Sequence, residues 1–209
     1  MSEATRLPGR PRSEATRQAV LESSAQLLDA ESYRSITIER IAHEAKVGKQ
    51  SIYRWWDSKA DVLLEAFTDR ALKRLPAYTP TGNGFRDLES LLQLFFSNVS
   101  QPAIAKTLRG LIAEAQVDPE FRHKFHSVFI STRRGMMREL LQSGMAKGEF
   151  RARLDVEVML DLIYGAFWYR LLSGTAAPLD DAFATTLVET LRPIMESRRP
   201  RPGKPESGA

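Results

Sequence analysis

The chain has 209 residues, of which 43% are hydrophobic and 27% charged, as is ordinary for a globular protein with a sizeable core. It contains no cysteine, which excludes disulfides, thiol nucleophiles and zinc–thiolate sites, and no apolar run approaches the ~18–20 residues that cross a bilayer. The N-terminus lacks a signal-peptide pattern, so we expect a cytoplasmic protein that does not bind membranes. The formal net charge of +4 is too small to identify a partner.

Helical periodicity is present in nearly every segment after residue 13, and no alternating strand pattern is convincing. The sequence therefore predicts an all-α fold of about nine helices. N-cap residues precede several of them, for example Thr37 and Asp118. The helices are expected at about 14–31, 37–45, 49–56, 58–75, 85–99, 102–115, 118–148, 154–172 and 180–196.

Changes in composition along the chain divide it into four parts. The first helices form an N-terminal three-helix domain and the later ones a larger helical bundle, whereas the ends are rich in Arg and Pro. We expect a flexible basic arm at 1–12, a three-helix N-terminal domain at 13–58, a larger helical domain at 59–196, and a disordered tail at 197–209.

The second and third helices have the pattern of a helix-turn-helix. Two short helices are joined by a tight turn, and the third helix is polar and basic on its outer side. Ile52 and Trp56 are four residues apart and can pack inward against Ile41. The remaining side chains of this helix are then free to face DNA.

The N-terminal end of the third helix carries donors and acceptors that suit base edges. Lys49 can donate to guanine, and Gln50 can pair with adenine. Lys59 begins the next helix, whose free N–H groups favour a phosphate. The candidate DNA-binding residues are Arg10, Arg12, Thr37, Gly48, Lys49, Gln50, Ser51, Tyr53, Arg54, Trp55 and Lys59.

Two of these assignments have an alternative. The arm with Arg10 and Arg12 either enters the minor groove or is a solvated tail. Trp55 either contacts the DNA backbone or covers the helix junction.

Residues 35–67, SITIERIAHEAKVGKQSIYRWWDSKADVLLEAF, closely resemble the DNA-binding signature of the TetR family of repressors. The matching positions are Thr37, Ile41-Ala42, Ala45 with Val47, Tyr53 with Trp55-Trp56, Lys59 and Val62-Leu63-Leu64. The chain departs from the family pattern at three places. Lys46 stands where glycine is usual in the turn, and a lysine is costlier than glycine in the left-handed region. Gly48 stands where a serine-type cap is common, and Trp55-Trp56 replaces the commoner His-Phe pair.

The resemblance continues at lower specificity through 113–121, 148–155 and 166–183, which are similar to one C-terminal subtype of the family. It implies that the domain at 13–58 binds DNA and that the domain at 59–196 serves ligand binding and dimerisation. By the same resemblance, the protein is a homodimer whose last two long helices form a four-helix bundle, and a cavity in the C-terminal domain holds an inducer. The candidate dimer residues are Val158, Leu162, Trp168, Leu187 and Leu191.

The composition of the second domain suggests the chemistry of the inducer. Many aromatic and aliphatic side chains but few polar ones predict a small apolar or aromatic compound, although a filled core without a cavity is the alternative. The candidate pocket residues are Phe67, Phe95, Leu108, Ile112, Phe129 and Tyr164. Asp161 and Arg170 interrupt an otherwise apolar helix, so each lies at a groove edge, in an ion pair or against a ligand.

Together these patterns predict a transcriptional repressor that binds a near-palindromic double-stranded operator as a homodimer and is released by a small apolar ligand. The sequence contains no nucleotide-binding loop, nucleophile elbow or paired catalytic carboxylates, so we expect neither enzymatic activity nor a cofactor or metal. A sequence-tolerant architectural DNA-binding protein is the main alternative. A helical bundle with a metal or enzymatic role is a third.

Overall fold

The computed structural model describes residues 13–74, 79–174 and 178–197. The predicted basic arm with Arg10 and Arg12, and all of the predicted tail except Ser197, lie outside the described residues. Within these ranges the fold is all helical, as predicted, and the only β contact is an isolated antiparallel bridge between Phe150 and Glu196. No helix in the described part of the chain is long and apolar enough to span a membrane.

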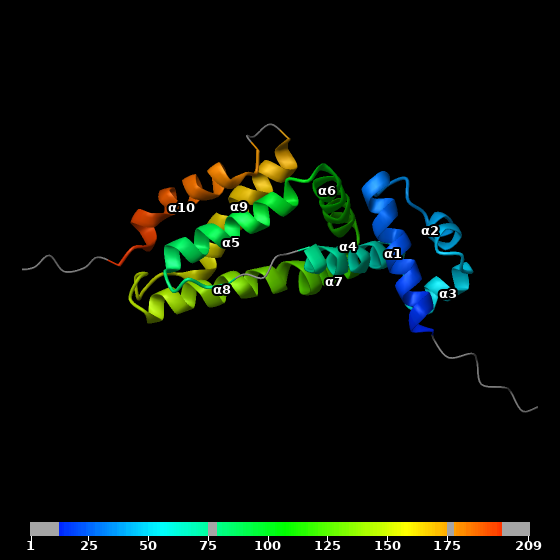
Figure 1. The fold of residues 1–209 in the computed structure, drawn as a ribbon, viewed down its shortest axis with the longest axis horizontal. Coiled ribbons are helices and arrows are strands. Elements are labelled where there is room, and N and C mark those ends of the chain that lie inside the picture. Colours follow the sequence, from blue (N-terminus) through cyan, green and yellow to red (C-terminus); the bar gives the residue numbers. More distant parts are fainter. Residues whose placement is uncertain (1–12, 75–78, 175–177, 198–209) are drawn as a thin grey trace, which may run out of the picture. The chain divides into compact units, whose positions relative to one another are not determined.

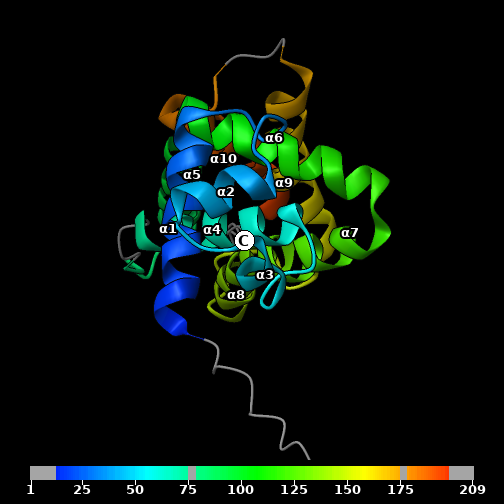
Figure 2. The ribbon, with the colours of Figure 1, turned by 90° about the vertical axis from the view of Figure 1, so that its right-hand side faces the viewer.

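The helices of the first compact unit come from two separate stretches of sequence, residues 1–74 and 106–125 (Figure 1). Helix α1 contacts α2, α3 and α4, and Figure 2 shows α2 and α3 beside it. Helix α7 packs against α4. The helices are α1 (Glu14–Ala30), α2 (Ile38–Glu44), α3 (Lys49–Tyr53), α4 (Lys59–Arg74), the greater part of α6 (Pro102–Val117) and α7 (Pro119–Phe125).

The second unit comprises residues 75–105 and 126–209. Helix α5 packs against α8 and α10, and α8 packs against α9, as Figure 1 shows. Its core is aromatic, with the ring of Phe96 stacked on Phe167 at 6.2 Å and on Phe183 at 5.3 Å between centroids. The helices are α5 (Gly84–Val99), the π-helical segment η1 (His126–Ile130), α8 (Ser131–Ala146), α9 (Val156–Ser173) and α10 (Asp181–Met195).

The sequence predicts one long helix over residues 118–148, and the structure has a continuous helical stretch with a π-helical turn inside it. Helix α7 leads directly into η1 and then into α8, so the described residues form nine continuous helical segments, in agreement with the prediction. The π segment begins where the chain passes from the first unit to the second. Helix α3 ends at Tyr53, earlier than the predicted Trp56.

The helix starts are fixed by side-chain caps. The hydroxyl of Thr37 accepts a hydrogen bond from the Arg40 amide at 3.2 Å, and Asp118 accepts from the amides of Glu120 and Phe121. Such caps satisfy amides that the first turn of a helix leaves without partners. Caps of this kind are made by Ser13, Thr37, Ser58, Asn83, Asp118, Asp155 and Asp180.

The packing unit is larger than the predicted DNA-binding domain. The sequence places a boundary after residue 58, whereas α4 and residues 106–125 pack with the N-terminal helices. The predicted boundary after residue 58 divides the chain by function rather than by packing, and it stays a prediction. By packing, part of the predicted ligand-binding domain belongs with the DNA-binding helices.

Candidate nucleic-acid interface and ligand cavities

The turn between α2 and α3 is made by Lys46, whose φ of 54° lies in the left-handed region. The amide of Val47 then donates to the Ala42 carbonyl at 3.0 Å, and Gly48 caps α3 with extended backbone but without a side-chain bond. A left-handed residue other than glycine costs about 1 kcal/mol or more. The cost expected from the sequence at Lys46 is therefore present.

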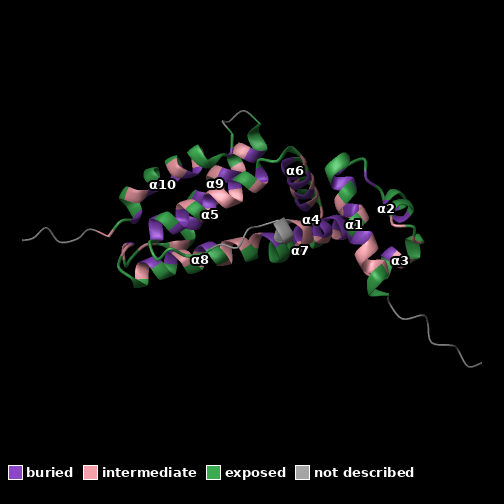
Figure 3. Cartoon of the chain, in the orientation of Figure 1, coloured by how far each residue is buried: buried purple, intermediate pink, exposed green. Residues whose placement is uncertain are grey.

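Helix α3 has one buried face and one exposed face. Ile52 is completely buried, as is Ile41 of α2, and Trp56 just after the helix is 4% exposed. Figure 3 shows the same alternation of buried and exposed residues along the helices of both units. The predicted DNA-binding residues of this segment fall on the outer face, where Gly48, Lys49, Gln50, Tyr53 and Arg54 are exposed and Ser51 is partly exposed.

Two basic residues of this surface have partners within the chain. The Nζ atom of Lys49 lies 2.8 Å from a carboxylate oxygen of Glu39, and this ion pair lowers the pKa of Glu39 to about 2. Arg54 donates to the hydroxyl of Ser51 at 3.2 Å. Both pairs are exposed, so a phosphate or base edge can replace the internal partner at little cost.

The other predicted DNA contacts also have structural roles. Thr37 caps α2, and the ring of Trp55 lies 5.5 Å from the guanidinium carbon of Arg17 on α1. Lys59 is half-buried in the first turn of α4, and its ammonium donates to the carbonyl of Tyr33 at 3.1 Å. Direct DNA contacts by these three residues stay predictions.

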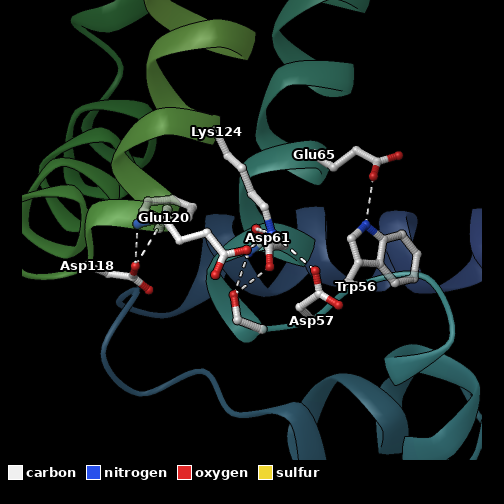
Figure 4. A network of polar contacts seen from close by, with 9 residues as sticks. Trp56, Asp57, Asp61, Glu65, Asp118, Glu120 and Lys124 are labelled. Carbon is white, nitrogen blue, oxygen red and sulfur yellow. Dashed lines mark hydrogen bonds and ion pairs between the residues drawn. The ribbon is translucent and has the colours of Figure 1, made fainter.

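A polar network that the sequence analysis missed joins α7 to the start of α4 (Figure 4). The ammonium of Lys124 lies 3.2 Å from Asp57 and 3.2 Å from Asp61, and 3.5 Å from Glu120 on its own helix. Its carboxylate partners raise the pKa of Lys124 above the usual range, against the opposing effect of desolvation. Because Lys124 and Asp57 are 67 positions apart, no local pattern could indicate their contact.

Two further contacts hold α6 and α4 in the first unit. The phenol of Tyr33 donates to Glu114 at 3.2 Å, and burial, followed by the nearby Glu114, raises the pKa of Tyr33 above its usual range. The indole of Trp56 donates to Glu65 at 2.7 Å, and Arg17 forms an ion pair with the same carboxylate. Trp56, just after α3, is thus attached to α4, and the same carboxylate attaches α4 to α1.

The six predicted pocket residues are divided between the two units. Phe67, Leu108 and Ile112 belong to the first unit. The other three line a cavity of about 30 Å³ in the second unit. Its lining residues are Phe95, Phe129, Ile130, Arg133, Arg134, Tyr164 and Trp168.

A larger cavity of about 330 Å³, which sequence reasoning missed, lies between the start of α5 and the end of α8. Two of its carboxylates already have partners. Asp87 accepts from the amide of Thr81 at 2.7 Å, and Glu149 accepts from the amide of Gly84 at 2.6 Å. The lining residues are Pro80, Gly84, Asp87, Leu91, Met136, Glu139, Leu140, Ser143, Gly144, Lys147 and Glu149.

Helix α9 is apolar on two faces. Its inner face includes Ile163 and Phe167, both fully buried, whereas Val158 and Leu162 are 53% and 45% exposed. The predicted dimer residue Trp168 is half-buried. The exposed nonpolar face of α9, hereafter the α9 stripe, comprises Val158, Leu162, Gly165, Tyr169 and Leu172.

Two other predicted dimer residues do not reach the surface. Leu187 is 9% and Leu191 5% exposed, on the side of α10 that packs against α5 in the same chain. Both therefore expose almost no side chain in the single chain, and their part in the dimer stays a prediction. The outer side of α10 instead carries Ala182, Thr186, Thr190 and Ile194.

The two charges within the apolar sequence of α9 are accounted for. Asp161 is exposed and forms an ion pair with Arg134 at 2.8 Å, which selects one of the alternatives for this residue. The guanidinium carbon of Arg170 lies 3.3 Å from the centre of the Phe183 ring, and Arg170 donates to the Pro178 carbonyl.

Known protein families match this chain over most of its length. Residues 20–66 match the profile of the bacterial regulatory proteins of the tetR family, and residues 79–191 match that of the tetracyclin repressor-like C-terminal domain. The uncharacterized HTH-type transcriptional regulator YdeS of Bacillus subtilis (strain 168) is 35% identical over 183 residues, covering 86% of this chain and 89% of the relative.

Solved structures are similar over most of the chain as well. The TetR family transcription regulator SCO0332 aligns with a TM-score of 0.72 and 32% identity, covering 85% of this chain and 97% of that one. The FadR regulator of Bacillus subtilis, solved in complex with stearoyl-CoA, has the same fold with a TM-score of 0.65 at 18% identity, covering 83% and 96%.

Proposed function

Because the chain belongs to the TetR family of bacterial helix-turn-helix transcriptional regulators, we propose that it is a sequence-specific repressor whose DNA affinity is relieved by a small ligand. One observation carries the proposal. Helix α3 is held by the buried Ile52 while its N-terminal residues Lys49 and Gln50 are exposed. A recognition helix needs this arrangement, in which its core is fixed and its first turn is free for the major groove.

We propose that the protein binds as a homodimer through the α9 stripe and the outer side of α10. The spacings in the stripe are four, three, four and three residues, the pattern of a helix that packs along another helix. An exposed apolar row of this kind is stabilised when a second copy covers it. The two-fold axis of such a dimer requires a near-palindromic operator.

The route from ligand to DNA is proposed to follow the continuous stretch α7–η1–α8. It begins with Lys124 bound to Asp57 and Asp61 and reaches Phe129 and Arg133 at the small cavity. A ligand that favours another position of this stretch would move the segment that follows α3. Binding releases DNA only if the ligand prefers a conformer whose two recognition helices no longer match successive major grooves.

Selection of binding sites from random duplex DNA tests the proposal. The full chain is expected to enrich one near-palindrome and to keep a large preference for it over bulk DNA at physiological salt. Binding without enrichment, with an affinity governed by salt alone, would instead support the architectural alternative.

A regulator of this kind acts on the bacterial chromosome, so we propose that it works in the cytoplasm.

A further inference from the structure

Arg133 on α8 has a guanidinium that contacts an aromatic ring and has no acidic partner among the described residues. Its Cζ atom is 3.6 Å from the centre of the Phe129 ring, and the phenol of Tyr164 donates to the Arg133 carbonyl at 2.9 Å. The guanidinium itself donates one hydrogen bond to the described chain, from Nη1 to the Phe129 carbonyl at 3.1 Å. A guanidinium has five N–H donors, so most of them have no partner among the described residues.

The neighbouring arginine shows the contrast. Arg134 has two carboxylates at 2.8 Å, from Glu157 and Asp161, and they raise its pKa although desolvation acts against them. Among the described residues, no carboxylate lies within ion-pair distance of Arg133. Burial accordingly lowers the pKa of Arg133 to about 10, with only a small opposing effect from Tyr164. Arg133 remains charged at neutral pH, and no carboxylate of the described residues offsets its desolvation.

The surroundings of Arg133 are built for a small anion attached to an apolar body. Arg133 lines the cavity of about 30 Å³, which has room for one or two waters or a carboxylate group. The other walls include the rings of Phe95 and Tyr164, 6.1 Å apart in an edge-to-face arrangement. The preceding π-helical turn, His126–Ile130, places Phe129 and Arg133 one turn apart, and π-helical turns occur frequently at functional sites.

We propose that Arg133 binds the carboxylate of an apolar or aromatic carboxylic acid, which is the ligand class of this regulator. The planar fork of the guanidinium matches the two carboxylate oxygens, and the aromatic walls receive the apolar remainder after small rotamer changes. This inference rests on the proposed ligand response, and it narrows the expected inducer from a small apolar or aromatic compound to one that carries a single carboxylate.

Matched probes test the inference on the full-length protein without DNA. The dissociation constants of phenylbutyrate and phenylbutyramide, and of decanoate and decanol, are measured by calorimetry. We expect each carboxylate to bind about tenfold or more tightly than its neutral analogue, because a charge-assisted bond to a buried guanidinium is gained. In Arg133→Gln this preference should disappear, whereas in the control Arg138→Gln, on the same helix, it should persist.

Arg133→Lys covers the case in which the glutamine variant does not fold, since it keeps the charge but not the fork and should keep a reduced preference. Equal affinity for acid and neutral analogue, an unchanged preference in Arg133→Gln, or no binding of any probe would each overturn the inference. The effect of the probes on operator DNA is measured separately. Neutral probes that release DNA without a carboxylate preference would leave the proposed repressor function intact and refute only the role of Arg133.

Discussion

The ammonium of Lys59 donates a hydrogen bond of 3.1 Å to the main-chain carbonyl of Tyr33 and lies 4.5 Å from the centre of its ring. Lys59 therefore connects the start of α4 to the segment between α1 and α2. The same residue is the predicted phosphate contact. One side chain can serve both purposes if phosphate binding adds to the bond with Tyr33, because an ammonium has three donors.

Replacement of Lys59 by methionine separates these two roles. We expect Lys59→Met to reduce the free energy of unfolding by about 1–2 kcal/mol, because a charged hydrogen bond and a cation–π contact are lost. It should also weaken binding to all duplexes alike and reduce the salt slope by about 1 per phosphate contact. Lys106→Met removes an exposed lysine of the same unit and controls for net charge. Lower stability with an unchanged salt slope would limit Lys59 to a structural role.

Gln50 is the residue whose replacement should alter sequence preference. Its side chain is exposed in the first turn of α3. Gln50→Ala is expected to change the preferred base at one position of each half-site by ~1–3 kcal/mol. We expect the hydroxyl of Tyr53 to contact a phosphate, so Tyr53→Phe should weaken binding to all duplexes equally. Competition binding with single-base variants of the selected operator measures both effects, and an unchanged preference in Gln50→Ala would remove this residue from the reading set.

Gly110 marks the close approach of α6 to the N-terminal helices within the first unit. A Cβ atom at Gly110 would lie 2.4 Å from the Cβ atom of Tyr33, which is too near the main chain to move aside. Gly110→Ala should therefore reduce the free energy of unfolding by ~1–3 kcal/mol. Urea denaturation followed by tryptophan fluorescence in a Trp168→Phe background, which leaves Trp55 and Trp56 as the emitters, reports on this unit.

Gly135→Ala is the matched control for Gly110→Ala. No atom lies within 4 Å of a Cβ atom added at this position in α8. It should stabilise the protein by ~0.5–1 kcal/mol, since alanine favours a helix more than glycine does. Equal effects of the two substitutions would contradict the close approach of α6 to Tyr33.

Local patterns predicted most of the helices and the character of the recognition surface. The caps at Thr37 and Asp118, and the left-handed turn at Lys46, depend on neighbouring residues, so they could be found in the sequence. The predicted exposure of Gln50 followed from the helical position of Ile52.

Features that depend on long-range packing were missed. The contact of Lys124 with Asp57 and the larger cavity join segments far apart in the chain. Likewise, the buried apolar residues of α10 lie on one face, and the sequence alone does not say whether a helix of the same subunit or of a second copy covers that face. For this reason Leu191 was assigned to the dimer surface although it is buried within the subunit.

The ion pairs of Glu157 with Arg134 and Arg138, both at 2.8 Å, predict a dependence of stability on acidity. The hydrogen bonds to Arg138 and Arg134 lower the pKa of Glu157 from 4.5 to about 2 in the folded state. The ionised carboxylate therefore stabilises the fold above pH 4.5, and this contribution is lost as the pH falls towards 2.

Glu157→Gln should accordingly have a lower Tm than the wild type at neutral pH. The difference should shrink below pH 4.5 and close only as the pH approaches 2 in thermal scans. Glu22→Gln, at an exposed position of α1, serves as the control and should show no such convergence. A Tm difference that is constant over the whole range would contradict the contribution of the Glu157 ion pairs.

The α9 stripe makes dimerisation the most direct test of assembly. Leu162 lies in its middle and is 45% exposed in the single chain. Leu162→Glu places a carboxylate without a partner at the centre of the proposed interface, so the dimer dissociation constant should rise by on the order of a hundredfold or more. Sedimentation at micromolar concentration should then detect monomer, and operator affinity should fall with it, because one recognition helix reads only a half-site. Val117→Glu changes an apolar residue that is 77% exposed at the end of α6, away from the stripe in sequence, and should leave the dimer intact. A wild-type protein that sediments as a monomer, or a Leu162→Glu dimer as stable as the Val117→Glu dimer, would show that α9 is not the interface.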